Sequence, residues 1–596
     1  MDKPISEGDI CLNVLDSFLG RSWFNLPYDE NFVEQIKESL NVSELISRIL
    51  SVQGLGIKEL ENYINPKIKN LMPNPNLLAD MTQAVDRVIL GIQNQEKICI
   101  FGDYDVDGAT SSALLISFFK YLHVNVTSYI PDRVKEGYGP NSNAMREIAS
   151  NGTKLVITVD CGISSFLPLE DANKIGLDVI VIDHHKVEKK LPKAVAVVNP
   201  NREDDHSDQG HLAAVGVVFL FIVALNSRLS KNGWYLDSDI KKPDLMQWLD
   251  LVALGTVCDV VPLKKLNRAF VKQGLSVISL KKNKGINALC NIININGDIS
   301  SSDLGYRIGP RINAGGRVGE ATLGTRLLSS QIYDEALGIA LRLDEYNSNR
   351  KEIELLVLKQ ATKQAKEKLL SNDKVIFVSH SDWHPGVIGI VASRLKEKFN
   401  LPVFVVAIDG GMSKGSGRSI NGVDLGKIIL GARNKDIIFN GGGHAMAAGF
   451  TVNEDSLGIL EQYIKDEVVL QTSGKFTNPV YRISALISSD GLDKSLLDDL
   501  KLLEPFGSGN EEPKIAIVSA NIVKSNLVGQ GHVRCFITTK SKGYIQAIAF
   551  NCMDNKLGHA LLDTNSRSMH LVGQIRENTW QNKSNIQFII EDGAWA

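Results

Sequence analysis

The sequence predicts an α/β protein with a largely parallel sheet, a second α/β domain joined to it by a long helix, and a C-terminal OB-fold β-barrel. Five short β-branched runs between residues 78 and 199 alternate with stretches of helical length, which indicates βαβ units. These runs are continuously apolar, as expected for strands buried on both faces. From about Thr325 to Leu370 the apolar residues keep helical spacing without a proline. Beyond residue 513, five strand candidates with no long helix among the last four favour a small barrel.

Length and composition support several folded domains. The chain has 596 residues, of which 43% are hydrophobic and 22% charged, so it can bury several cores. The longest uncharged apolar run, Leu212 to Leu225, is shorter than the roughly 20 residues that cross a bilayer, and we interpret it as a buried core helix. No membrane association is expected.

The cysteines and the N-terminus indicate a reducing compartment, the cytoplasm. Seven cysteines are scattered without a C-x-x-C pair, which argues against a disulfide framework or a zinc ribbon. The first residues are acidic where an export signal would be basic and apolar. The net charge of −3 weakens the case for a nucleic-acid partner, unless the acidic residues gather around metal ions.

The chain divides into five predicted segments. Residues 1–77 form a proline-punctuated N-terminal extension that wraps onto the core, and residues 78–325 form the first α/β domain. Residues 326–372 form the connecting helix and residues 373–470 the second α/β domain. A linker at residues 471–478 precedes the barrel of residues 476–596.

An acidic turn follows the first predicted strand. Asp103, Asp105 and Asp107 occupy alternate positions in the sequence GDYDVDG, where a parallel sheet should bind ligands. An EF-hand loop would require Glu at the position of Leu114 and a preceding helix, so that alternative is disfavoured. A solvated acidic turn without a ligand remains the alternative for this motif alone.

Three further segments end in acids or imidazoles. Asp160 follows one strand, His184 and His185 follow the next, and Asp259 follows the apolar segment Leu249–Val257. Carboxylates with imidazole suit Mn²⁺ or Mg²⁺, and so many ligands indicate two ions bridged by Asp160. The alternative for the histidines is a capped strand end.

At this point a family resemblance is evident. The motifs GDYDVDG, TVDCG, VIDHH and GTVCDVVPL resemble, in this order, the signature motifs of the DHH phosphoesterase superfamily. The segments Gly309–Arg317, Trp383–Leu395 and Leu503–Asn510 resemble the RecJ family of bacterial single-strand-specific 5′ exonucleases. The resemblance extends from about Ser17 to the C-terminus. It implies a DHH domain, a DHH-associated (DHHA1) domain and an OB domain for the three predicted domains.

The resemblance also implies a mechanism. Asp105, Asp107, Asp160, His184 and Asp259 would be metal ligands, Asp103 a further candidate ligand, and His185 a contact to the scissile phosphate. The implied activity is two-metal hydrolysis of single-stranded DNA from the 5′ end, which releases 5′-mononucleotides in DNA repair and recombination. The implied partners are a DNA helicase and a single-strand-binding protein, and the implied state is a monomer.

Glycine-rich segments and arginines predict phosphate contacts. We expect turns at Lys414–Ser419 and Asn440–Gly449 to present backbone N–H groups to an anion. A loop at Gly309–Arg317 would add guanidinium groups. The alternatives are tight αβ connections and surface salt bridges. The candidate phosphate-binding residues are Arg311, Arg317, Ser416, Arg418, Ser419, Gly442, Gly443 and His444.

The predicted barrel is mildly basic, with nine Lys or Arg against five Asp or Glu in residues 513–596. Its aromatic residues suit stacking on bases, although each could instead fill the barrel core. They are Phe536, Tyr544, Phe550, Trp580 and Phe588.

Two other functions share these motifs. A DHH-family phosphodiesterase acting on short oligonucleotides or RNA would keep the ligands but would not need a barrel. An inactive DHH scaffold protein would be expected to have lost ligands, and none is missing here.

Overall fold

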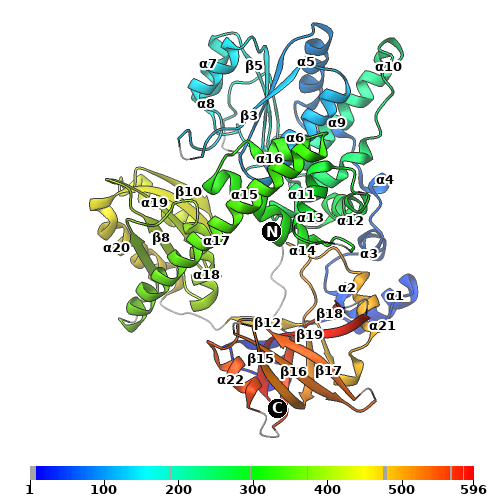
Figure 1. Ribbon diagram of the computed structural model, residues 1–596, viewed down its shortest axis with the longest axis vertical. Helices are drawn as coiled ribbons and strands as arrows, with labels where there is room; N and C mark the ends of the chain where they lie inside the picture. Colours follow the sequence, from blue (N-terminus) through cyan, green and yellow to red (C-terminus); the bar gives the residue numbers. More distant parts are fainter. Residues whose placement is uncertain are drawn as a thin grey trace.

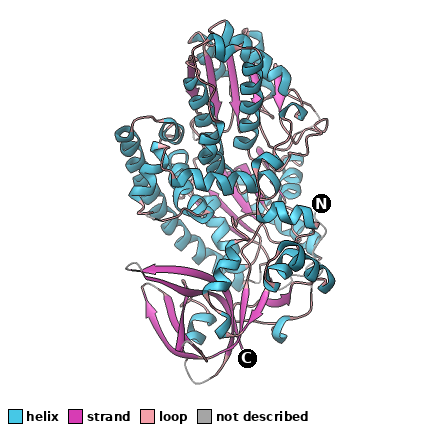
Figure 2. Cartoon of the chain, turned by 90° about the vertical axis from the view of Figure 1, so that its right-hand side faces the viewer, coloured by secondary structure: helices cyan, strands magenta, loops and turns pink. Residues whose placement is uncertain are grey.

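The computed structural model describes residues 8–133, 135–187, 190–295, 297–371, 373–473, 479–529, 531–541, 543–563, 567–580 and 583–596. A parallel-sheet domain lies at the top of Figure 1, a second α/β domain at the left, and a β-barrel at the bottom. Figure 2 shows the parallel sheet between layers of helices and the curled barrel strands at the opposite end.

The first domain is built on a five-stranded, wholly parallel sheet. Its order is β3-β2-β4-β5-β6, as the alternating apolar runs predicted. Helices α5, α6 and α9 cover one face, and α7 and α8 cover the other. The bounds are β2 Ile98–Gly102, β3 Val126–Tyr129, β4 Leu155–Val159, β5 Asp178–Ile182, β6 Ala196–Val198, α5 Met81–Gln93, α6 Val106–Tyr121, α7 Ser142–Ser150, α8 Phe166–Lys174 and α9 Ala214–Lys231.

Helix α9 is long and apolar enough to cross a membrane by length and composition alone. However, 72% of this segment is buried inside the protein, and it packs on the parallel sheet. The predicted buried core helix is therefore confirmed.

A helical region connects this sheet to the next domain. The long connecting helix, α17, begins at Tyr333 rather than near Thr325, because residues 323–329 form the separate helix α16. The bounds are α10 Trp234–Asp237, α11 Leu249–Cys258, α12 Lys265–Ser279, α13 Lys284–Ile292, α14 Ser301–Asp303, the π-helix η4 Leu304–Ile308, α15 Gly309–Val318, α16 Leu323–Ser329 and α17 Tyr333–Leu370, with short 3-10 turns at Cys11–Asn13, Pro75–Leu77 and Leu245–Trp248.

The predicted loop at Gly309–Arg317 is wrong, because this segment is the helix α15. Its glycines permit close packing instead of a turn. A Cβ atom on Gly309 would lie 2.4 Å from Sγ of Cys258, and one on Gly316 would lie 2.8 Å from the carbonyl oxygen of Tyr104. The helix can therefore lie directly against the residues that surround the acidic cluster.

The second α/β domain has the strand order β10-β11-β9-β8-β7, with α19 and α20 on one face and α17 and α18 on the other. The glycine-rich turns predicted here are wrong, because Met412–Arg418 and Asn440–His444 are strands β9 and β10. Gly415 leaves room for the ring of Phe450, which a Cβ atom would approach to 2.1 Å. The remaining bounds are β7 Ile376–His380, β8 Val403–Ala407, β11 Ala447–Asn453, α18 Ile388–Phe399, α19 Leu425–Asn434 and α20 Leu457–Thr472.

The C-terminal strands form an OB-type barrel. Strands β14 and β15 are separated only by Asn521 yet stand near opposite ends of the order β13-β14-β18-β19-β17-β16-β15, so the sheet curls into a barrel. Residues 474–478, most of the predicted linker, lie outside the described residues. The bounds are β12 Val480–Ile483, β13 Ala485–Ile487, α21 Lys494–Lys501, β14 Ile515–Ala520, β15 Ile522–Val528, β16 His532–Thr539, β17 Gly543–Ala549, α22 Lys556–Leu562, β18 Met569–Trp580 and β19 Lys583–Trp595.

We had expected the N-terminal extension to wrap onto the α/β core, but it packs mainly on the barrel. Strand β1 pairs in parallel with β12, and Ile36, Ile46 and Leu60 share one apolar cluster with barrel residues such as Ile515. The extension comprises β1 Ser22–Asn25, α1 Glu30–Leu40, α2 Glu44–Ser51, α3 Ile57–Ile64 and α4 Ile68–Leu71. The predicted domain boundaries as such remain predictions.

One buried arginine joins the first domain to this N-terminal and barrel unit. Arg268 of α12 is 1% exposed and donates to the carbonyl oxygens of Tyr63 (2.6 Å), Leu503 (2.9 Å) and Glu504 (2.8 Å). Its guanidinium group also lies 3.9 Å from the ring centroid of Tyr63. The charge is therefore satisfied by carbonyl dipoles from two segments of a neighbouring unit.

We predict that Arg268→Ala weakens the contact between these units. Loss of the guanidinium group removes the donor of the Tyr63 and Glu504 carbonyl oxygens, while Leu503 keeps its bond from Asn510, so the local free energy of opening should fall by about 2 kcal/mol. Native-state hydrogen exchange of barrel amides would measure it. The control is Arg228→Ala, whose ion pair with Asp86 is about half exposed, and which should change stability by less than about 0.5 kcal/mol. Equal protection in both variants would contradict the prediction.

Candidate metal centre

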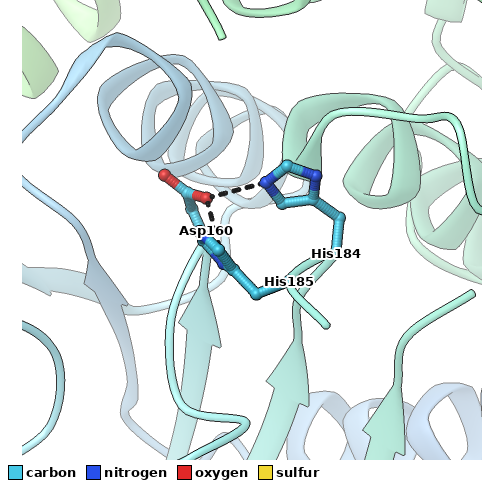
Figure 3. A group of neighbouring side chains, drawn as sticks. All are labelled: Asp160, His184 and His185. Atoms are coloured by element: carbon cyan, nitrogen blue, oxygen red, sulfur yellow. Dashed lines mark ion pairs between the residues drawn. The ribbon is translucent and has the colours of Figure 1, made fainter. Parts of the chain in front are cut away.

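The seven acids and imidazoles predicted from the sequence lie together at the carboxyl edge of the parallel sheet. Figure 3 shows three of them, Asp160, His184 and His185, at the ends of neighbouring strands. The side chains form three overlapping groups whose ligand atoms lie within 4.8 Å of one another. These groups are Asp107, His184 and Asp259; Asp103, Asp105 and Asp160; and Asp160, His184 and His185.

The acidic turn after β2 is held by glycine packing and helix capping. A Cβ atom on Gly108 would lie 2.4 Å from the carbonyl oxygen of Asp103, so only glycine allows the chain to turn this tightly. Asp105 caps α6 by accepting from the N–H groups of Asp107 and Gly108. Both oxygens of Asp107 accept from the first N–H groups of α9, at 2.6 and 2.9 Å. Two helix N-termini thus stabilise negative charge here.

His184 presents its Nε2 atom to the acids. Its Nδ1 atom lies 3.1 Å from the carbonyl oxygen of Leu212, which fixes a proton on Nδ1 and leaves a lone pair on Nε2. That Nε2 atom lies 3.4 Å from Oδ1 of Asp160 and 3.5 Å from Oδ2 of Asp259. Burial, followed by the neighbouring His185, lowers the pKa of His184 to about 4, so the ring is neutral and able to bind a metal ion.

Asp183 positions both histidines, a role that we did not predict. Its Oδ1 atom accepts from the N–H groups of His184 and His185 and lies 2.7 Å from Nδ1 of His185. Its Oδ2 atom accepts from the N–H of Ile163. Burial favours the neutral acid, but the contacts with His185 outweigh it and lower the pKa of Asp183. The sequence signal was present, since Asp183 directly precedes both imidazoles.

The other acids are crowded and poorly solvated. Burial, followed by repulsion from Asp105, raises the pKa of Asp107 to about 7 and that of Asp160 well above its ordinary value. Burial and repulsion from Asp107 raise the pKa of Asp259 to about 9. In addition, Oδ1 of Asp103, Nε2 of His184 and Oδ2 of Asp259 are buried without a hydrogen-bond partner among the described residues. Carboxylate oxygens and an imidazole nitrogen that face one another without hydrogen-bond partners are suitable ligands for divalent cations.

A polar cavity of about 320 Å³ opens beside the acids. Tyr138 reaches it and donates from its hydroxyl to the carbonyl oxygen of Asp160 at 2.9 Å, and Arg133 lies over the ring of Tyr104. These residues were not predicted, although Arg133 and Tyr138 follow β3, another strand of the parallel sheet. The lining residues are Asp103, Tyr104, Asp105, Arg133, Tyr138, Asp160, His185, Cys258, Asn313, Gly316 and Arg317.

Of the two arginines predicted to bind phosphate from a loop, which lie instead in α15, Arg317 faces this cavity and Arg311 does not line it. Burial, followed by the nearby Arg133, lowers the pKa of Arg317 to about 10, so it remains cationic at neutral pH. It also donates to the carbonyl oxygen of Gly386 and so bridges the two α/β domains. Arg311 instead bonds Asp344 of α17 at 2.7 Å, which matches the salt-bridge alternative.

The second domain contributes Arg418 and His444. Arg418 is held by the hydroxyl groups of Ser393 and Ser416, each at 3.1 Å. His444, exposed at the end of β10 near Gly442 and Gly443, is close enough to Lys186 and His185 for their charges to lower its pKa, after the larger effect of burial. Figure 1 shows β10 on the side of the second domain that faces α15.

Ser419 does not face an anion as we had expected. It is fully buried, its hydroxyl donates to the carbonyl oxygen of Val423 at 2.6 Å, and its N–H donates to Met446. All of its polar hydrogens are therefore used inside the domain, where they fix the chain after β9.

Comparison with known families agrees with this architecture. The chain matches the models of the DHH family N-terminal domain over residues 97–256, the DHHA1 domain over residues 372–469 and the RecJ OB domain over residues 483–592. The fold and its acidic cluster therefore define a DHH-type protein with an added OB barrel.

Comparison with individual relatives identifies the family within this class. The single-stranded-DNA-specific exonuclease RecJ of Dickeya dadantii is 34% identical over 558 residues, which cover 92% of this chain and 95% of the relative. RecJ of Escherichia coli is 34% identical over 567 residues, covering 92% and 96%. The crystal structure of Thermus thermophilus RecJ with Mn²⁺ superposes with a TM-score of 0.78 at 28% identity, covering 96% of this chain and 78% of that one. The chain belongs to the RecJ family.

We predict that Asp160→Ala removes at least one of two bound Mn²⁺ ions. Asp160 belongs to two of the three ligand groups, so its loss should damage both positions. Titration with Mn²⁺, followed by electron paramagnetic resonance of the free ion, would count the sites. Asp208→Ala is the control, because Asp208 is 82% exposed and pairs with Lys265. Two tight sites in a folded Asp160→Ala variant would contradict the shared-ligand arrangement.

Proposed function

We propose that this protein is a single-stranded-DNA-specific exonuclease that degrades its substrate from the 5′ end by phosphodiester hydrolysis. It releases 5′-mononucleotides and acts in DNA repair and recombination in the cytoplasm. The observation that carries the proposal is the buried cluster of acids and imidazoles that opens into a cavity lined on another side by Arg133 and Arg317. The names of the relatives support it. We also propose a monomer that works beside a DNA helicase and a single-strand-binding protein.

The cluster would hold two Mn²⁺ or Mg²⁺ ions, the cations named in the T. thermophilus RecJ structures. Asp107, His184 and Asp259 suit one ion, and Asp103, Asp105 and Asp160 suit the other. Asp160 would be shared, because it lies within 3.4 Å of His184. When bound, such ions activate water at neutral pH and neutralise charge that develops on phosphate oxygens.

The protein's own groups would orient the scissile phosphate. Asp183 fixes Nδ1 of His185, so the opposite edge of this half-exposed ring is available to the phosphate. Arg317 and Arg133 lie across the cavity and supply positive charge to phosphate oxygens. Tyr138 holds the backbone of Asp160, whose φ of +59° is strained for a residue with a side chain. The chain therefore positions both the acids and the substrate.

Arg418, Ser416 and the end of β10 would bind the 5′-terminal phosphate. The hydroxyl groups of Ser393 and Ser416 hold Arg418 in a fixed orientation, and His444 offers a further donor at the end of β10. A phosphate held there would place the first linkages of the strand at the cavity, which gives the reaction its polarity. Gly442 and Gly443 would contribute backbone contacts, while Arg311 and Ser419 would act indirectly, given the bonds described above.

The barrel would hold the remainder of the strand on the outward face of β16 and β17. Phe536, Tyr544 and Phe550 all have exposed surface, and Tyr544 and Phe550 are 62% and 53% exposed. Arg534 lies over Phe536 on the same face. Phe588 is instead fully buried in the core, and the side chain of Trp580 lies outside the described residues. Exposed aromatics beside a cation suit sequence-tolerant stacking of bases.

The barrel and the intact cluster both disfavour the alternatives. A phosphodiesterase specific for short oligonucleotides has no use for a distant stacking surface, and an inactive scaffold has no need for seven converging ligand side chains. The proposal therefore remains a nuclease for long single strands.

We predict that Arg418→Ala slows digestion of 5′-phosphorylated strands more than that of 5′-hydroxyl strands. Loss of a charged donor should reduce the rate on the phosphorylated substrate by an amount equivalent to about 1.5–3 kcal/mol. Strands labelled at the 5′ or the 3′ end and digested with Mn²⁺ or Mg²⁺ would measure both polarity and rate.

In the same assay the native protein should release the 5′ label first, and Asp160→Ala should release none. Arg433→Ala, at the end of α19, controls for loss of a positive charge in the same domain. Early release of the 3′ label by the native protein would exclude the proposed polarity. Equal slowing of both substrates would reassign Arg418 to general backbone binding.

We predict that Phe536→Leu with Tyr544→Leu weakens binding of long strands only. Each lost stack should reduce affinity by about 1–3 kcal/mol, while trinucleotides, which cannot reach the barrel, should be cleaved at the native rate. Fluorescence anisotropy against salt concentration would measure the affinity. Point variants are preferable to deletion of the barrel, because deletion exposes the apolar faces of α1 to α3. Unchanged affinity for long strands would show that this face does not hold DNA.

A further inference from the structure

Tyr306 is the most exposed aromatic residue among those the structure describes, at 82%. It lies in the π-helical turn η4, which continues directly into α15. Within the described part of the chain, its ring and hydroxyl have no aromatic or hydrogen-bond partner. Five-residue π turns often mark functional positions in helices. Tyr306 is not among the residues proposed above to bind the metal ions or the 5′-terminal phosphate.

The helical segment that carries Tyr306 runs from the barrel to the catalytic cavity. At its start, the hydroxyl of Ser301 donates to the carbonyl oxygen of Phe506 in the barrel domain at 2.6 Å. At its end, Asn313 and Arg317 line the cavity. Figure 1 shows α14 above the barrel and α15 leading toward the junction of the two α/β domains. Tyr306 therefore lies between the two proposed DNA-binding regions.

Tyr306 also lies on the side of this segment that leads to the cavity. Tyr306, Pro310, Asn313 and Arg317 recur every three or four positions and all have exposed surface, as do the adjacent Arg307, Arg311 and Gly316. The opposite side is buried, including Ile308 and Ile312. At 1.5 Å per residue, Tyr306 stands about 17 Å along the helical segment from Arg317.

The backbone beneath Tyr306 is firmly packed. A Cβ atom on Gly309 would lie 2.4 Å from Sγ of Cys258, and one on Gly305 would lie 3.5 Å from a methyl group of Val257. Both contacts lie at the end of α11, beside Asp259. The ring is therefore free on a backbone whose position is fixed relative to the metal centre, which suits a stacking platform more than a structural side chain.

We propose that Tyr306 stacks on a base of the single strand as it passes from the cavity to the barrel. This inference rests on the proposed nuclease function, because it requires a long strand whose end lies in the cavity. Stacking on an aromatic face tolerates every base, so it would hold the strand without restricting its sequence. It would also hold the strand at a point between the cavity and the barrel.

The test compares Tyr306→Leu with Tyr306→Phe, both combined with Asp160→Ala so that the strand is bound but not digested. Fluorescence anisotropy with a 5′-phosphorylated single strand should show binding weakened about 5- to 100-fold by Leu, and by less than about twofold by Phe. A structural role for the ring would not separate these two variants at so exposed a position. Tyr121→Leu, at the far end of α6, is the control and should bind normally.

A scan with abasic sites identifies the stacked base. One abasic position, a few nucleotides from the 5′ end, should weaken binding in the Tyr306 protein and have no further effect in Tyr306→Leu. Equal binding by the Tyr306→Leu and Tyr306→Phe variants would overturn the proposal. An abasic effect of the same size in the Tyr306 protein and in Tyr306→Leu would also overturn it. Failure of the nuclease proposal has a different result, since strands would then not be digested by the native protein at all.

Discussion

The constraint on which this structure depends is the repulsion among carboxylates gathered in one poorly solvated cluster. Burial raises the pKa values of Asp103, Asp107, Asp160 and Asp259, so the apo cluster opposes its own ionisation. The surrounding elements reduce that cost before any cation binds. Helix α9 directs two N–H groups at Asp107, and Asp105 caps α6. Apolar packing places these helices on the parallel sheet, and their N-termini then lie where the negative charge gathers.

Much of the fold and most of the site follow from local sequence. Continuous apolar runs identify parallel strands, and parallel strands must deliver the residues that follow them to one edge. Asp103, Asp160 and His184 could therefore be grouped without knowledge of the fold, and the structure brings them together. Asp259 was grouped with them although its segment is the helix α11, because the sequence showed only an apolar run that ends in an acid.

The features that sequence reasoning missed depend on contacts between distant segments. Glycine marks both a turn and a close approach, so Gly309 and Gly415 indicated turns where the structure has a helix packed on Cys258 and a strand packed on Phe450. Arg311 and Ser419 have suitable side chains, but their distant partners, Asp344 and the carbonyl group of Met446, can be assigned only in three dimensions. Tyr138 belongs to no motif and is identified by its bond to Asp160.

Because the N-terminal helices and the barrel share one apolar core, the N-terminal helices can complete their packing only after the barrel has been synthesised. Helices α1 to α3 are translated first, yet the apolar surface that covers Ile46 and Leu60 belongs to the last domain to leave the ribosome. Domains generally fold as they emerge, so both α/β domains can form while this N-terminal segment still lacks its partner. Nascent chains therefore carry an uncovered apolar segment until translation is nearly complete, and a premature stop codon before the barrel would leave that segment permanently exposed to chaperones and proteases.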